Sequence, residues 1–228
     1  MKGAVIGIAG FSQDGIAAVG DTLIGALALE GYFAILSTQC GDPVRGGEAS
    51  CRIRFGTTPV LNSGGVLDLA VVLDWRNFSL SSGELTVGPE TVVIQDRKPG
   101  SGALGLPPGG FRPAATISAP ISEIATRSGG KSLAKDSVVL GLLASWFGLP
   151  KRRILAGISS RYRAKDKTAL TANERAFSAG VEFADRHPLG QDLKIDPCPA
   201  RGAGPWRLGG SWNRLADRPA LPKANAGY

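Results

Sequence analysis

The stretch KGAVIGIAGFSQDGIAAVGDTLIGALALEGYFAILSTQ, residues 2–39, decides the fold. Residues 2–9 form a short apolar run rich in β-branched side chains, which is typical of a buried strand. A tight loop bounded by Gly10 and Gly15 follows, and from Ile16 the apolar residues recur three and four positions apart, as on one face of a helix. Residues 32–39 then resume the strand pattern. Strand, glycine loop, helix and strand are the opening of a Rossmann-like α/β domain.

The loop of residues 10–15, here called the glycine loop, matches neither of the standard phosphate-binding motifs. A dinucleotide fingerprint requires G-x-G-x-x-G and an acidic residue after the second strand, but Gln39 and Cys40 stand there. A P-loop requires Lys and Ser or Thr after its last glycine, but Gly15 is followed by Ile16 and Ala17. The glycine loop is then either a tight βα turn or an anion site built from backbone N–H groups at a helix start.

A second distinctive stretch is GDPVRGGEASCRIRF, residues 41–55, in which a loop leads into an alternating strand. Arg45 presents a planar guanidinium that can bind a carboxylate or a phosphate, and the glycines Gly46 and Gly47 allow close backbone approach. The alternative is an arginine that fastens its own loop. Arg52 and Arg54 share one face of the following strand, opposite the apolar face.

Composition limits the classes to which the protein can belong. With 228 residues, 43% hydrophobic and 20% charged, the chain has the content of one ordinary globular domain with a tail. No apolar run approaches the length of a membrane span, so a cytoplasmic protein is expected. Cys40, Cys51, Cys198 and the single His187 are too scattered for a metal centre. The net charge of +7 favours an acidic partner or a phosphorylated ligand.

The rest of the chain continues the α/β pattern and ends in a tail of different composition. Strands are predicted at 67–73, 91–94 and 115–118, and a Gly/Pro-rich loop at 98–113. Four helices are predicted after them: one over 121–126, one from a cap at Asp136 to Phe147, one that begins after Pro150, and one from a capping box at Thr171 and Glu174 to Arg186. The basic turn Lys151-Arg152-Arg153 stands at a helix start, where cations require an anion or an acidic neighbour, or solvent. Residues 1–187 are therefore expected to form one domain and 188–228 an extended Pro/Gly/Arg-rich basic tail that a partner orders.

Together these features resemble the gamma domain of 2-oxoacid:ferredoxin oxidoreductases. The resemblance is carried by the glycine loop with Gln13, by Glu30-Gly31-Tyr32, by Arg45-Gly46-Gly47 leading into Arg52-Ile53-Arg54, by the helix after Asp136, and by Asn173 to Gly180. It covers about residues 1–186. Two departures accompany it: Phe11-Ser12 and Asp14 replace small residues of the loop, and Asp136 replaces an Asn. The negative charge of Asp14 is expected to oppose a phosphate.

That family decarboxylates 2-oxoacids with coenzyme A and thiamine diphosphate and passes the electrons to ferredoxin. The resemblance implies a gamma-type subunit that carries no catalytic residue, holds no metal and binds no cofactor alone, and that works with alpha and beta subunits and with ferredoxin or another acceptor. Thiamine diphosphate, Mg and iron–sulfur clusters are expected on those partners. The chain itself is expected to support the active site and to contact coenzyme A; the candidate contacts are Gly10, Ser12, Gln13, Gly15, Arg45, Gly46 and Gly47.

Two other classes of function remain as alternatives. The first is a nucleotide-binding Rossmann-like protein outside this family, which the failed fingerprint weakens. The second, a basic nucleic-acid-binding module, is weaker still, because the charge is spread along the chain and no reader motif is present. Nucleic acid is therefore not expected as a partner.

Overall fold

The computed structural model describes residues 1–40, 47–80, 84–97, 112–129, 134–162, 167–190 and 193–197. Its centre is a six-stranded sheet in the order β2-β3-β1-β4-β5-β6. The strands are β1 (Gly3–Phe11), β2 (Phe33–Cys40), β3 (Glu48–Gly56), β4 (Leu67–Val72), β5 (Val87–Asp96) and β6 (Ala115–Ala119). Strands β1, β4, β5 and β6 pair in parallel, whereas β3 is antiparallel to both of its neighbours.

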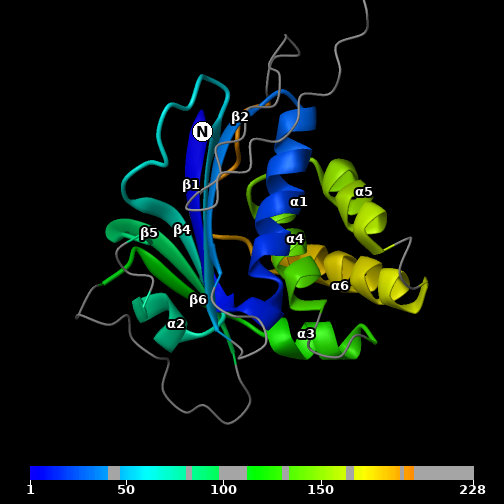
Figure 1. The fold of residues 1–228 in the computed structure, drawn as a ribbon. Helices are drawn as coiled ribbons and strands as arrows, with labels where there is room; N and C mark the ends of the chain where they lie inside the picture. Colours follow the sequence, from blue (N-terminus) through cyan, green and yellow to red (C-terminus); the bar gives the residue numbers. More distant parts are fainter. Residues whose placement is uncertain are drawn as a thin grey trace, which may run out of the picture.

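Helices lie on both faces of the sheet and make three layers (Figure 1). One face carries α1 (Ile16–Leu29), α3 (Ile121–Arg127), α4 (Lys135–Trp146), α5 (Lys151–Tyr162) and α6 (Lys167–Arg186). The other face carries the short helix α2 (Trp75–Leu80). The expected Rossmann-like α/β class is confirmed. The Gly/Pro-rich stretch predicted at 98–113 lies, up to residue 111, outside the described residues.

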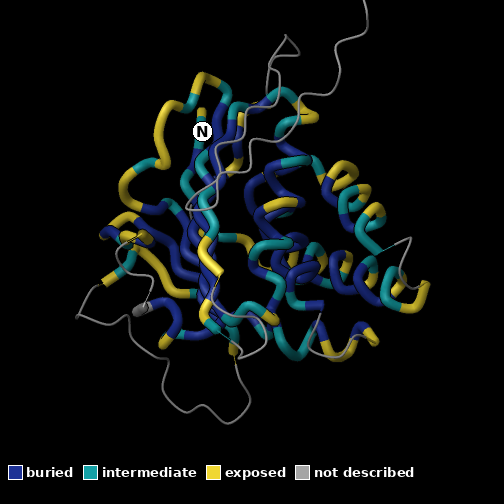
Figure 2. The backbone as a smooth tube through the Cα atoms, in the orientation of Figure 1, coloured by how far each residue is buried: buried dark blue, intermediate teal, exposed yellow. Residues whose placement is uncertain are grey.

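The main core lies between the sheet and the larger helical layer. On β3, the alternation seen in the sequence turns Cys51, Ile53 and Phe55 toward the helices, where all three are buried. Arg52 and Arg54 therefore project to the face that carries α2. Figure 2 shows the sheet and α4 as the most deeply buried parts of the chain.

Helix α4 packs closely against α6 through two glycines. A Cβ atom at Gly141 would overlap the carbonyl oxygen of Phe177, and one at Gly180 would overlap the carbonyl oxygen of Val138. Gly141 lies in a stripe of small residues spaced four apart on α4, with Ser137 and Ser145, and its lack of a side chain lets α6 approach at close range.

Two predicted helix starts are wrong. Helix α4 begins at Lys135 with Ala134 as its N-cap, so Asp136 is its second residue and not its cap. Helix α6 begins at Lys167, so the capping box lies inside the helix. There the Thr171 hydroxyl donates to the Lys167 carbonyl (3.0 Å), and the Glu174 carboxylate accepts from the Ser159 hydroxyl (2.9 Å).

A short segment beyond residue 188 packs against the domain. Leu193 and Ile195 are buried, and the Ile195 N–H donates to the Phe147 carbonyl (2.9 Å). The Met1 ammonium donates to the Lys194 carbonyl (2.6 Å). Residues 198–228 lie outside the described part, so the domain boundary and the partner-ordered tail stay predictions. Within the described residues, no helix combines the length and the apolar character that crossing a bilayer requires.

Candidate functional site

The candidate site lies at the edge of the sheet where β1 and β4 end. After β1 the chain continues into α1 on one face, whereas after β4 it continues into α2 on the other face (Figure 1). The helices therefore diverge between two neighbouring parallel strands, which is the topological switch point where α/β proteins bind their ligands.

The glycine loop crosses this switch point as a single tight turn. Ser12–Asp14 form one turn of 3-10 helix, and Gly15 adopts a left-handed conformation with φ of 77°. The Gly15 N–H donates to the Ser12 carbonyl (3.3 Å). A Cβ atom at Gly15 would lie 2.9 Å from the Cβ of Asp136, so both the backbone angle and the packing require glycine here.

Ser12 joins the glycine loop to the start of β3. Its N–H and its hydroxyl both donate to the Gly47 carbonyl, at 2.9 Å and 3.0 Å. The structure thus brings together Gly10, Ser12, Gln13, Gly15 and Gly47 of the predicted site. Gln13 is exposed at the turn. Arg45 and Gly46 lie outside the described residues.

Asp14, whose negative charge the sequence suggested would oppose a phosphate, is turned into the protein. Its side chain is 5% exposed, and Oδ2 accepts the Phe11 N–H (3.0 Å). Oδ1 accepts from Nζ of Lys135 (2.8 Å), a residue 121 positions along the chain. The carboxylate is therefore neutralised internally, and it fixes the glycine loop on the start of α4.

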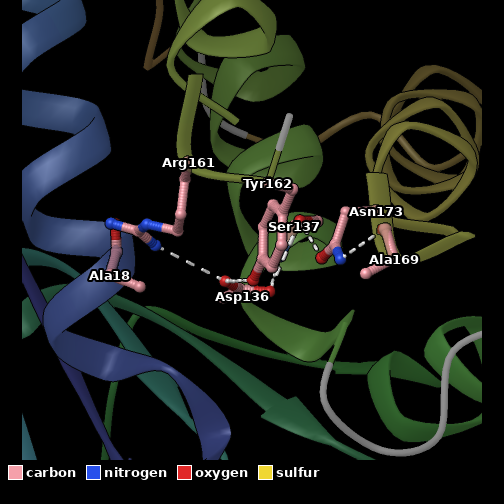
Figure 3. A network of polar contacts seen from close by, with 7 residues as sticks. All are labelled: Ala18, Asp136, Ser137, Arg161, Tyr162, Ala169 and Asn173. Atoms are coloured by element: carbon pink, nitrogen blue, oxygen red, sulfur yellow. Dashed lines mark hydrogen bonds and ion pairs between the residues drawn. The ribbon is translucent and has the colours of Figure 1, made fainter. Parts of the chain in front are cut away.

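A second buried carboxylate, Asp136, lies next to Gly15. Figure 3 shows the residues around it. Its Oδ1 accepts the Ser137 N–H (2.7 Å), and its Oδ2 accepts from the Tyr162 hydroxyl (3.2 Å). The Arg161 guanidinium lies 3.7 Å from Oδ2. Burial raises the pKa of Asp136, and these hydrogen bonds and the Arg161 charge oppose that rise. Burial, together with the Asp136 charge, also raises the pKa of Tyr162 to about 12.

The Asp136 network connects four helices. Arg161 on α5 also donates to the Ala18 carbonyl on α1 (3.1 Å). The Ser137 hydroxyl donates to Oδ1 of Asn173 (2.7 Å), and the Asn173 amide donates to the Ala169 carbonyl (2.8 Å), both on α6. Figure 3 shows these side chains converging between the helices. The network is a support beneath the glycine loop.

The basic turn does not belong to this site. Arg153 pairs with Glu30 (2.7 Å), immediately after the C-terminal end of α1, and Lys151 lies 3.8 Å from Asp185. The 14 residues of α1 separate this position from the glycine loop, which corresponds to about 21 Å at 1.5 Å per residue. Two of the three predicted cations thus have acidic neighbours on this chain.

The sequence also predicts a short helix or loop from Asp74 at the carboxyl end of a buried strand, where α/β ligand sites gather, although none of its residues was among the candidate contacts. Oδ1 of Asp74 accepts the N–H groups of Arg76 (3.1 Å) and Asn77 (3.3 Å) and so organises the start of α2. Asn77 is 5% exposed, and among the described residues its side-chain nitrogen has no hydrogen-bond partner. The sequence feature that points to these residues is an aspartate directly after an apolar strand, which places it at the carboxyl edge of the sheet.

The fold and the position of the site define a Rossmann-like domain whose ligand edge includes the glycine loop and Gly47, to which Ser12 donates. The family model described as pyruvate ferredoxin/flavodoxin oxidoreductase matches residues 5–183. The chain belongs to this family. The alternative of a nucleotide-binding protein outside the family is therefore wrong. Comparison with curated protein sequences gave no match.

Solved structures of other proteins share this fold. One is the 2-oxoglutarate:ferredoxin oxidoreductase from Magnetococcus marinus with 2-oxoglutarate, coenzyme A and succinyl-CoA bound, at 20% identity and a TM-score of 0.75, covering 87% of this chain and 34% of that one. This chain thus spans about a third of that protein. A keto/oxoacid ferredoxin oxidoreductase gamma subunit from Geobacter sulfurreducens has 22% identity and a TM-score of 0.59, covering 80% of this chain and 99% of that one. Pyruvate oxidoreductase subunit PORC from Thermotoga maritima has 16% identity and a TM-score of 0.62, covering 80% and 97%.

Proposed function

We propose that this chain works as the gamma-type component of a multi-subunit 2-oxoacid:ferredoxin oxidoreductase, beside alpha and beta subunits that carry thiamine diphosphate, Mg and iron–sulfur clusters. The observation that carries the proposal is the family match over residues 5–183 on a chain with the gamma-type fold. Within the described residues, no group of three His, Cys, Asp or Glu side chains is placed to hold a metal ion. The proposal therefore gives this chain a supporting and binding role.

Coenzyme A is the ligand we propose at the glycine-loop edge, but not in a deep phosphate cradle. The space beside Gly10 is bordered by Leu73 and Asp14, and the space beside Gly15 by Asp136, so both glycines serve internal packing. The described residues that fit a ligand are on the outer side, exposed Gln13 and the Ser12–Gly47 junction. Arg45 stands two residues before Gly47 in the sequence.

On this proposal Arg45 supplies the charge and Gln13 supplies an amide donor. An arginine binds a phosphate through two parallel N–H donors, which a lysine does not reproduce. Coenzyme A, when bound, supplies the thiol that accepts the acyl group. This chain's residues hold its phosphates and thereby limit where that thiol can reach.

The experiment that tests the proposal uses the assembled complex. The chain is co-expressed with candidate alpha and beta subunits, co-purification is scored, and reduction of ferredoxin or a viologen dye is measured against coenzyme A concentration. Arg45→Lys is expected to raise the apparent constant for coenzyme A by about tenfold or more, because a charge-assisted contact contributes about 1.5–3 kcal/mol. The melting temperature of the isolated chain should change little.

Lys151→Glu with Arg152→Glu is the matched control, since this basic turn lies beside the far end of α1. It should leave the coenzyme A constant unchanged. If the chain does not assemble with such subunits, the subunit role is refuted. If it assembles but Arg45→Lys, Arg45→Ala and Gln13→Ala all leave the constant unchanged, the chain does not touch coenzyme A and its role is scaffolding.

A further inference from the structure

A polar cavity of about 290 Å³ lies on the face of the sheet opposite α1. Its lining includes Ser37 of β2, Arg52 of β3, the turn of residues 63–65, and Glu84 and Thr86 just before β5. Arg52 stands directly opposite both Gly7 and Ser37 in the sheet register. It is four residues from the start of β3, about 13 Å along the strand, so the cavity is separate from the glycine-loop edge.

Arg52 is a buried cation with only carbonyl partners. It is 7% exposed, and its Nε donates to the Ser63 carbonyl (2.8 Å). Its two terminal nitrogens donate to the carbonyl oxygens of Glu84 and Gly65. Within the described ranges, no carboxylate lies within 4.0 Å of this guanidinium. A buried charge is normally paired with a carboxylate in contact. The charge of Glu84 acts on Arg52 without such a contact.

The guanidinium also has donors to spare. Arginine carries five N–H groups, and the three carbonyl contacts use three of them. Glu84 is exposed, and its carboxylate accepts from the Gln39 amide (2.6 Å). A purely structural tether of the 63–65 turn would explain the three carbonyl contacts. It would not explain why the buried guanidinium has no carboxylate in contact among the described residues, or why a cavity lies beside it.

We propose that this cavity binds a small oxyanion, a carboxylate or a phosphate group, on the guanidinium of Arg52. The hydroxyls of Ser37 and Thr86 supply further donors to such a group. A volume of about 290 Å³ is at the small end of ligand pockets and exceeds the size of a phosphate ion. This inference does not depend on the proposed coenzyme A contact, since it concerns another face of the sheet.

A change at Glu84 distinguishes an anion site from a structural tether, because only an anion site predicts that anion affinity rises when the negative charge of Glu84 is removed. Glu84 lines the same cavity and its negative charge repels an anion, so Glu84→Gln should tighten anion binding severalfold. Ser37→Ile should weaken binding at least about tenfold, because it fills space beside Arg52 while leaving the arginine in place. Arg52→Gln should remove binding. Arg54→Gln is the control, because Arg54 lies on the same face of β3 but bonds to Asn62 instead.

The experiment is a titration of the full chain with inorganic phosphate and, separately, with acetate, at ionic strength held constant with chloride. Binding is followed by calorimetry and by the rise in melting temperature that a ligand of the folded state produces. We expect the native chain and Arg54→Gln to respond, Ser37→Ile to respond weakly and Glu84→Gln to respond more strongly. A larger response to phosphate indicates a tetrahedral ligand group, and a larger response to acetate indicates a planar carboxylate.

Two results would overturn the proposal. One is no response of the native chain to either anion beyond that of chloride. The other is an equal response of the native chain, Ser37→Ile and Glu84→Gln, which would place the anion elsewhere. Ser37→Ile and Glu84→Gln retain the three carbonyl contacts of Arg52, so the test stands even where Arg52→Gln fails to fold.

Discussion

Replacing Gly15 by alanine probes the turn on which the candidate site is built. Gly15 has φ of 77° and ψ of 25°, a left-handed conformation that residues with a Cβ atom adopt at a cost. The added methyl would lie 2.9 Å from the Cβ of Asp136 and 3.3 Å from its Oδ2. Both Cβ atoms are held by the backbone, so neither can rotate away.

The two terms give the expected magnitude. The left-handed conformation costs about 1–2 kcal/mol for a non-glycine residue. Overpacking against a fixed neighbour costs about 1–3 kcal/mol. Gly15→Ala should therefore lower the free energy of unfolding by about 2–5 kcal/mol. For a domain of this size, that corresponds to a fall in melting temperature of about 4–20 °C.

The matched control is Gly25→Ala on the same helix. A Cβ atom at Gly25 meets nothing within 4 Å, so alanine there should stabilise the chain by about 0.5–1 kcal/mol through helix propensity. Urea denaturation and thermal melting of both variants measure the difference. If Gly15→Ala melts within about 1 °C of the native chain, or both variants lose stability equally, the reasoning about this turn is refuted.

Two further predictions concern the carboxylates beneath the loop. Lys135→Met leaves Asp14 buried without its cation and should lower the free energy of unfolding by about 3–5 kcal/mol, measured by urea denaturation. Adding Asp14→Asn to this variant should recover much of the lost stability. A double variant that is no more stable than Lys135→Met would contradict the pairing. Burial raises the pKa of Asp136, so the folded state keeps this proton to higher pH than the unfolded chain does, and stability falls as pH rises from about 3.9 through the raised value. Asp136→Asn should remove that fall, and an unchanged dependence of unfolding free energy on pH would count against it.

The elements that sequence reasoning predicted well are those decided locally. The glycine loop and α1 follow from glycine positions and helical spacing, and the buried face of β3 follows from the alternation that includes Cys51 and Ile53. The place of β3 between β1 and β2 was not predictable in this way. Strand order depends on pairing between segments that are distant in the sequence, and the hydrophobic pattern within one segment does not determine it.

The helix starts failed for a related reason. Asp136 has the chemistry of a cap, but its carboxylate is engaged with Tyr162 and Arg161 of α5. Glu174 has the spacing of a capping box, but it accepts from Ser159, also on α5. In both cases a tertiary partner takes the side chain that a local rule assigns to the helix end. The orientation of Asp14 was hidden in the same way, because its partner Lys135 is remote in sequence.

The two departures from the family pattern near the loop are balanced by charge inside the fold. Asp14 faces Lys135, and Asp136 faces Arg161, so each added carboxylate has a cation supplied by another part of the chain. At distances larger than the separation of a pair, the electrostatic fields of its two opposite charges largely cancel. An anion on the outer side of the glycine loop is therefore repelled little by these two buried pairs. The carboxylates therefore do not argue against coenzyme A at this edge. On the proposal of coenzyme A at this edge, its affinity depends on the positive charge that the chain offers to the phosphates, and Arg45, two residues before Gly47 in the sequence, is the residue to change.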